Sequence, residues 1–203
     1  MKLNFLGLGL GLLVSAQSLQ AKVAPSSVPA IAMKALMQAD LAESAANLIN
    51  WKVGDYQDLQ IEFVFGGGDG SKVATKEDKE RNAIWLETNM TIMGQKQKTE
   101  ALFDRATAEV LELIVNGQKQ DPKEGGDGEV EIIEQSETKV TVPAGTFECI
   151  YIKAKTKSQG QEMIVQLWAN PIDVTLDGVL KLSAETAFGD LVISLKKFGN
   201  KKL

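Results

Sequence analysis

Histidine is absent from this chain of 203 residues, and cysteine occurs once, as Cys149. Without histidine, neither a Ser-His nor a Cys-His nucleophile pair can form, and no zinc or iron site can use imidazole. Cys149 has no second cysteine in the chain to pair with, and its alternation with Phe147 and Tyr151 predicts a packed thiol. An enzyme would need an uncommon carboxylate pair or a Ser-Lys arrangement. The sequence therefore predicts a non-enzymatic protein with no cofactor and no metal.

The chain also lacks any apolar run of the roughly 20 residues that a membrane-spanning helix needs. It opens with Lys2, an apolar stretch over residues 5–14 that three glycines interrupt, and small or polar residues after it. This order is typical of a secretory signal peptide. We predict that residues 1–21 form the signal, that cleavage follows Ala21 or, as the alternative, Ser18, and that the mature protein does not span a membrane.

A basic excess is missing as well. Removal of the signal takes away one lysine and no acid, so residues 22–203 hold 21 basic and 27 acidic residues, a net charge of −6. Nucleic-acid binding needs clustered lysine and arginine that displace counterions from phosphates. The sequence therefore predicts no nucleic-acid partner. Its length suits one domain over residues 22–203, which we expect to be periplasmic or secreted.

One helix is predicted near the start of the mature chain. Ser27 suits an N-cap with Pro29 in the first turn, and apolar residues then recur at three- and four-residue spacing to about Asn47. The opposite side lacks the basic excess of helices that lie on membrane surfaces. We expect this amphipathic helix to pack on a sheet through residues such as Met33 and Met37.

The remainder of the chain has the pattern of short strands separated by glycine-containing turns. Asn116–Gly117 suits a type I′ hairpin turn, because both of its central positions require positive φ. Val142–Gly145 suits a type I turn in which Gly145 supplies the positive φ at the fourth position. We expect a further turn at Gly66–Gly70, followed by a charged connection from Lys72 to Arg81.

The fold class follows from these strands. Roughly nine or ten short strands with hairpin-length connections predict an antiparallel meander. A twisted sheet of about ten strands has to close, split or curve around something. We therefore predict a mainly β fold in which a single curved antiparallel sheet, half-barrel-like, packs on one N-terminal amphipathic helix.

Three aromatic residues in apolar strand contexts are the candidate ligand-binding residues: Trp85, Phe103 and Trp168. In one interpretation they line a concave face that accepts an apolar ligand. In the other they fill a packed core between sheet and helix. Large aromatic side chains at alternating strand positions suit both roles, so the sequence leaves the two open.

The segment VPAGTFECIYIKAKTKSQGQEMIVQLWANPIDVTLDGVLKL, residues 142–182, resembles a family of exported bacterial β-sheet proteins of unassigned function. The match covers mainly the C-terminal third of the chain. Such proteins are similar in architecture to the periplasmic lipoprotein carriers, in which a curved sheet wraps a helix around an apolar cavity. The resemblance implies a lipid-facing role and supplies no catalytic residue.

Two functions follow from these observations. The first is a non-enzymatic periplasmic protein that binds an apolar ligand, a lipid or acyl chain, on a curved sheet. The alternative is a structural or assembly component of the cell envelope that docks a protein partner, for example by strand addition at an exposed sheet edge. The first requires a cavity, and the second requires a docking surface.

Overall fold

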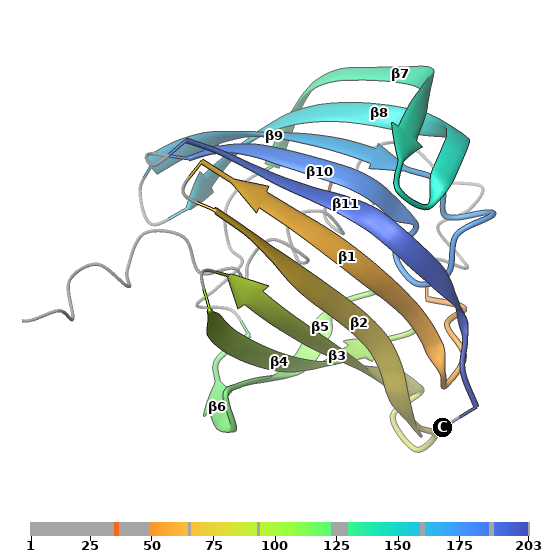
Figure 1. Ribbon diagram of the computed structural model, residues 1–203. Coiled ribbons are helices and arrows are strands. Elements are labelled where there is room, and N and C mark those ends of the chain that lie inside the picture. The colour runs from red at the N-terminus through yellow and green to blue at the C-terminus, as the bar shows by residue number, and fades with distance from the viewer. Residues whose placement is uncertain are drawn as a thin grey trace, which may run out of the picture.

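The computed structural model of the protein describes residues 35–36, 49–64, 66–92, 94–122, 130–158, 161–186 and 189–202. These residues contain eleven strands in a single antiparallel sheet that does not close (Figure 1). The strands are β1 (Asp55–Phe63), β2 (Gly66–Asp78), β3 (Ala83–Ile92), β4 (Gln95–Asp104), β5 (Val110–Val115), β6 (Gln118–Gln120), β7 (Val130–Val142), β8 (Gly145–Ser158), β9 (Gln161–Ala169), β10 (Val179–Thr186) and β11 (Gly189–Asn200). None of the described residues belongs to a helix long and apolar enough to cross a bilayer.

The sheet consists of two meanders joined at their first and last strands. Its order is β6-β5-β4-β3-β2-β1-β11-β10-β9-β8-β7, so β1 and β11 pair in the middle while β6 and β7 are the edges. Gln120 and Val130 are ten residues apart in sequence, a separation that the chain can span over at most about 36 Å. A flat sheet of this order would hold its two edges about 48 Å apart. The sheet must therefore curl, and Figure 1 shows that it does.

Alternation along the strands defines an inner and an outer face. In β9, Met163, Val165 and Leu167 are buried, whereas the residues between them are half-buried. We call the face that carries these buried side chains the inner face. Its larger group of apolar residues, the main cluster, includes Leu59, Ile61, Met90, Ile152, Ala154, Met163, Val165, Leu167, Leu182 and Ile193. A smaller group, the second cluster, consists of Ile49, Trp51, Ala74, Ile84, Leu86, Ala101, Phe103, Ala108 and Leu176.

The glycine-rich stretch Gly66–Gly70 is not the turn that the sequence predicts. It is the first part of β2, paired with β1 on one side and with β3 on the other. A Cβ atom at Gly68 would lie 1.9 Å from the carbonyl oxygen of Thr91, so glycine here allows a close approach of two strands. The expected connection over residues 72–81 is also wrong, because β2 continues to Asp78.

Other predicted elements agree better with the structure. Asn116 and Gly117 have φ values of 50° and 80°, which confirms the hairpin turn between β5 and β6. Residues 130–142 form the single strand β7, in which a bulge between Ile132 and Glu134 interrupts the pairing with β8. The long β2 and the short β6 bring the sheet to eleven strands.

The predicted helix and signal peptide fall largely outside the described residues. Of the expected helix, only Ala35 and Leu36 are described; both have helical backbone conformation and are buried in the main cluster. The signal, residues 1–21, lies outside the described residues altogether. Both therefore remain predictions.

The turn between β7 and β8 holds one end of the sheet together. Pro143 and Ala144 form the turn, and the Ala144 amide donates a hydrogen bond to the carbonyl oxygen of Leu195 in β11 at 3.0 Å. Gly145 has the predicted positive φ, with a value of 142°. Such a φ lies beyond the left-handed helical region that asparagine tolerates, in a region populated almost only by glycine.

We expect both Gly145→Val and Gly145→Asn to destabilise the protein by about 1 to 3 kcal/mol through backbone strain. Chemical denaturation followed by circular dichroism measures the effect. Gly117→Asn is the control, because its φ of 80° lies nearer the left-handed helical region and a Cβ atom there would meet nothing within 4 Å. A Gly145→Asn variant as stable as the wild type would contradict the strain argument.

Candidate functional site

A band of polar side chains crosses the inner face of β1, β2 and β3. Gln57, Lys72 and Thr88 are cross-strand neighbours in one row, and their exposed fractions are 0%, 5% and 6%. Along β3, Leu86 on one side of Thr88 belongs to the second cluster and Met90 on the other belongs to the main cluster. The polar band therefore separates the two apolar clusters.

The loop between β9 and β10, Asn170–Gly178, extends to this band, and we call it the strap. Because β11 lies between β10 and β1 in the sheet, the strap has to pass over β11. The Thr175 hydroxyl donates to the carbonyl oxygen of Tyr56 at 3.1 Å, and the side-chain amide of Gln57 donates to the carbonyl oxygen of Thr175 at 2.7 Å. Leu176, with a φ of 62°, inserts into the second cluster. The strap thus connects the two halves of the sheet.

A buried ion pair holds the strap against the polar band. The Lys72 ammonium donates to Oδ2 of Asp177 at 2.5 Å, and the two side chains are 6% and 3% exposed. Oδ1 of Asp177 accepts hydrogen bonds from the Gln57 side chain at 3.1 Å and from the Val179 amide at 3.2 Å. Both carboxylate oxygens are thereby occupied. The arrangement suits a structural connection between the strap and β2, because the ammonium and the carboxylate bind each other.

Four buried side-chain polar atoms have no hydrogen-bond partner within the described part of the chain. Two are at the second cluster, Nε1 of Trp51 and Nε of Arg105, and the others are Oε1 of Gln57 in the polar band and the hydroxyl of Thr156. Thr156 is 1% exposed and lies opposite Val130 and Met163 of the main cluster. A buried hydroxyl without a partner is unfavourable by about 1 to 3 kcal/mol. Thr156 is therefore a position where a polar atom of a bound molecule would be stabilised.

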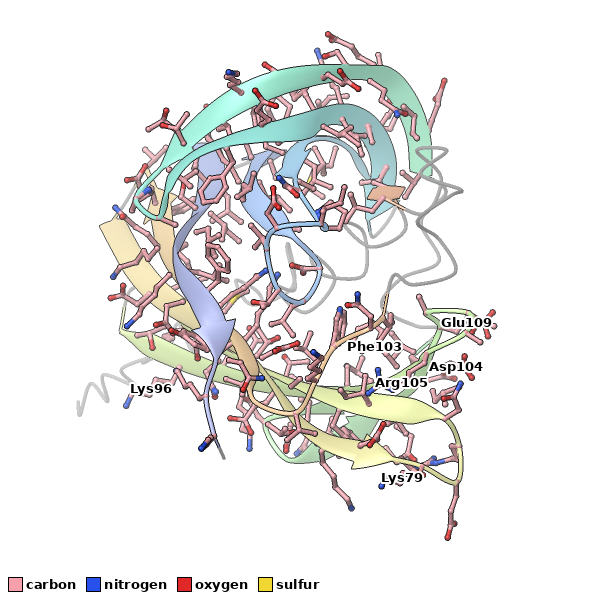
Figure 2. The ribbon with its side chains drawn as sticks, turned by 90° about the vertical axis from the view of Figure 1, so that its right-hand side faces the viewer. Lys79, Lys96, Phe103, Asp104, Arg105 and Glu109 are labelled. Carbon is pink, nitrogen blue, oxygen red and sulfur yellow. The ribbon has the colours of Figure 1, made fainter. Side chains whose placement is uncertain are left out.

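Phe103, one of the three predicted ligand-binding residues, lies on the inner face in the second cluster. It is 4% exposed and makes an edge-to-face contact with Trp51 at a centroid distance of 5.3 Å. Figure 2 labels it near Arg105. The Arg105 guanidinium donates to the carbonyl oxygens of Ile49 and Trp51 at 2.8 and 3.0 Å, so it holds the segment before β1 against Phe103.

The other two predicted residues lie on the outer face. Trp168 alternates with the inward Leu167, contacts Tyr151 at a centroid distance of 5.0 Å, and has the Lys181 ammonium 5.0 Å from its ring. It is half-buried and also packs against the main cluster. Trp85 is half-buried between two inward residues of the second cluster and pairs across strands with Leu102. The structure therefore does not bring the three residues together, and only Phe103 faces inward.

The residues that sequence reasoning missed are the polar ones: Gln57, Lys72, Asp177 and Thr156. Lys72 is two residues from the inward Ala74, so the two side chains point to the same face of β2. Once residues 66–78 are recognised as a strand, this spacing indicates that Lys72 faces inward. Asp177 gives no such signal, because its partner is 105 residues away in sequence.

Cys149 is buried, in agreement with the predicted packed thiol. Burial raises the pKa of the Cys149 thiol, and a backbone hydrogen bond involving Val140 acts in the opposite direction. The protonated thiol therefore predominates at neutral pH. The described residues hold no group of three or more aspartate, glutamate or cysteine side chains placed to bind a metal ion.

Comparison with known proteins gives a likeness in fold. No protein-family model matches the sequence, and no curated protein matches it significantly. The solved structure of the hypothetical protein CT021 from Chlamydia trachomatis is similar at a TM-score of 0.51 and 13% identity, covering 78% of this chain and 93% of that one.

Two further similar structures have TM-scores below 0.5. A protein with a YmcC-like fold from Bacteroides fragilis is similar at a TM-score of 0.42 and 9% identity, covering 74% of this chain and 97% of that one. A chain of the MucA/MucB complex from Pseudomonas aeruginosa gives 0.41 and 9%, covering 84% of this chain and 57% of that one. At these identities, the likeness to CT021 establishes a common fold and leaves function to the site itself.

Proposed function

We propose that the protein is a non-enzymatic exported protein, periplasmic or secreted, that binds a lipid or acyl chain on the inner face of its curved sheet. The observation that carries the proposal is the main cluster, which spreads apolar side chains over the inner face of β1 and of β8–β11 in a sheet that does not close. Concave apolar surfaces with a few placed polar groups are the usual form of small-molecule sites.

The polar band and the strap support a position for the ligand on one side of the inner face. On the side of the second cluster, Trp51 and Phe103 pack against each other, and Leu176 of the strap inserts among them. On the side of the main cluster, the Thr156 hydroxyl has no hydrogen-bond partner in the described part of the chain. We therefore place the ligand against β8 and β9, with its hydroxyl, ester or carboxyl group near Thr156.

Thr156→Val tests this proposal, since valine keeps the shape and removes the hydroxyl. If Thr156 contacts the ligand, the variant should bind a fluorescent fatty acid about 5- to 10-fold more weakly, the effect of one lost hydrogen bond. Its unfolding midpoint should equal or exceed that of the wild type, because an unsatisfied buried group is removed. The titration uses delipidated mature protein, and Lys153→Met on the outer face of β8 is the control.

Absence of saturable binding at micromolar concentrations in the wild type would contradict the ligand proposal. A filling variant, Ala154→Leu, adds an independent readout. If Ala154 borders a ligand site, the larger side chain should weaken fatty-acid binding with little loss in the free energy of unfolding. If Ala154 lies in a packed core, over-packing should lower the free energy of unfolding by about 1 to 3 kcal/mol. Native mass spectrometry of protein from its own host then identifies any lipid that is retained.

The second candidate function is an envelope component that docks a protein partner. The observation that favours it is β7, a strand of 13 residues that forms one edge of the sheet in the described part of the chain. An exposed strand edge offers main-chain donors and acceptors to an added strand. Native mass spectrometry distinguishes the two functions, because a protein partner adds a mass far larger than a lipid does.

A further inference from the structure

We propose that β7 pairs edge to edge with β7 of a second copy of this chain, antiparallel and centred on Thr138, so that two sheets continue as one. The inference rests on the docking function above and names its partner. It is independent of ligand binding on the inner face. Four features of β7 carry it: its exposure, its fixed position, the direction of its backbone groups and its charge pattern.

The two edges of the sheet differ in how far they are exposed to pairing. β6 has three residues, and short edge strands resist the addition of another strand. β7 has 13 residues without proline, and its side chains from Ile133 to Lys139 are all exposed. The bulge next to Ile133 disturbs only the first part of the strand, so the pairing of β7 with β8 is regular from Glu134 to Val142.

This edge is held in place by the hairpin that it belongs to. Besides the bond from Ala144 to Leu195, Phe147 of β8 contacts Phe198 of β11 at a centroid distance of 6.0 Å. Both contacts fix the β7–β8 hairpin on β11. A pre-formed strand loses little conformational entropy on pairing, which favours association.

The turn geometry determines which backbone groups of β7 are available. Val142 and Gly145 flank the two-residue turn and therefore form a hydrogen-bonded pair in the β7–β8 ladder. Because hydrogen-bonded and non-hydrogen-bonded pairs alternate, Thr138 directs its amide and carbonyl toward β8. Glu137 and Lys139 direct theirs toward the free edge, where a second strand can accept and donate.

Charge then selects the register of the pairing. With Thr138 on the two-fold axis, Glu137 of each copy lies opposite Lys139 of the other. The amide and carbonyl groups of these two residues then form the hydrogen bonds between the copies. An axis through Glu137 or through Lys139 would place like charges directly opposite each other, which is destabilising. Lys139 already contacts Glu148, but these side chains are 69% and 81% exposed, so that pair holds it weakly.

Cross-linking tests the register. Two residues on the axis form a non-hydrogen-bonded pair with Cβ atoms about 4.5 to 5.5 Å apart, close to disulfide geometry. Thr138→Cys is placed in a Cys149→Ala background, since Cys149 lies directly opposite Thr138 within the same chain. We expect mild oxidation to yield a covalent dimer of this variant. The control Thr141→Cys in the same background should stay monomeric, and equal or absent cross-linking in both would overturn the proposal.

Charge exchange tests the pairing without cysteine. In sedimentation equilibrium of the mature chain, Lys139→Glu and Glu137→Lys should each raise the dimer dissociation constant about tenfold or more, because each change alters two symmetric pairs. The double variant Glu137→Lys with Lys139→Glu should restore dimerisation. A wild type that stays monomeric at 100 µM, on the order of the concentration where weak edge pairing is detectable, would overturn self-pairing. A different protein bound in native mass spectrometry would then preserve the docking function alone.

Discussion

Replacing Asp177 with alanine should destabilise the protein by about 3 to 5 kcal/mol, the usual effect of removing one partner from a buried ion pair. The variant leaves the Lys72 ammonium buried without its carboxylate, and Gln57 and the Val179 amide lose an acceptor as well. Urea denaturation measures the change as a lower midpoint at an unchanged slope.

A surface ion pair provides the matched control. Lys196 and Asp69 lie 2.7 Å apart, at about the same separation as the buried pair, but their side chains are 43% and 73% exposed. Asp69→Ala should therefore cost less than about 1 kcal/mol. Equal losses from the two alanine variants would mean that the pair of Lys72 and Asp177 is solvated in solution.

The double variant Lys72→Met with Asp177→Leu separates charge from packing. Replacing both members of a buried pair by apolar residues of similar size is often neutral or stabilising. We expect this variant to recover most of the stability that Asp177→Ala loses. If it does not, the remaining loss belongs to the hydrogen bonds that Asp177 makes to Gln57 and Val179 rather than to the ion pair.

The sequence predicted most of the sheet because its strands alternate and its turns contain glycine. Asn116–Gly117 forms the hairpin turn expected of it, and Gly145 has the expected positive φ between β7 and β8. The failure at Gly66–Gly70 has a physical cause. Glycine allows a close approach of two strands as well as a turn, and only the partner strand, here with Thr91, shows which applies.

The candidate site was less accessible to sequence reasoning than the fold. The alternation along a strand shows which of its residues share a face but not which face becomes the inner one. The sequence therefore left open whether Trp168 lines a concave face or fills the core, and in the structure its position alternates with that of the inward Leu167. The strap contacts β1 and β2 from more than 100 residues away. Such contacts depend on the pairing of β1 with β11, which no local pattern indicates.

Phe103→Ala should destabilise the protein by about 3 to 5 kcal/mol, because it removes a fully packed aromatic ring from the second cluster. The contact of Phe103 with Trp51 is lost, and the cavity forms where Arg105 holds the segment before β1. Trp168→Ala removes a larger but half-buried ring, which contacts Tyr151 and Lys181 and packs against the main cluster, and should cost less, about 1 to 2 kcal/mol.

The comparison of these two variants decides where the predicted aromatic residues act. Thermal unfolding measures stability, and the fatty-acid titration measures binding in the same preparations. If the ligand lies against β8 and β9, Phe103→Leu, which retains apolar volume, should bind the fatty acid as the wild type does, although it is less stable. Weakened binding by Phe103→Leu at nearly unchanged stability would move the ligand to the second cluster. Strong loss of binding by Trp168→Ala would move it to the outer face, and the inner-face proposal would then be wrong.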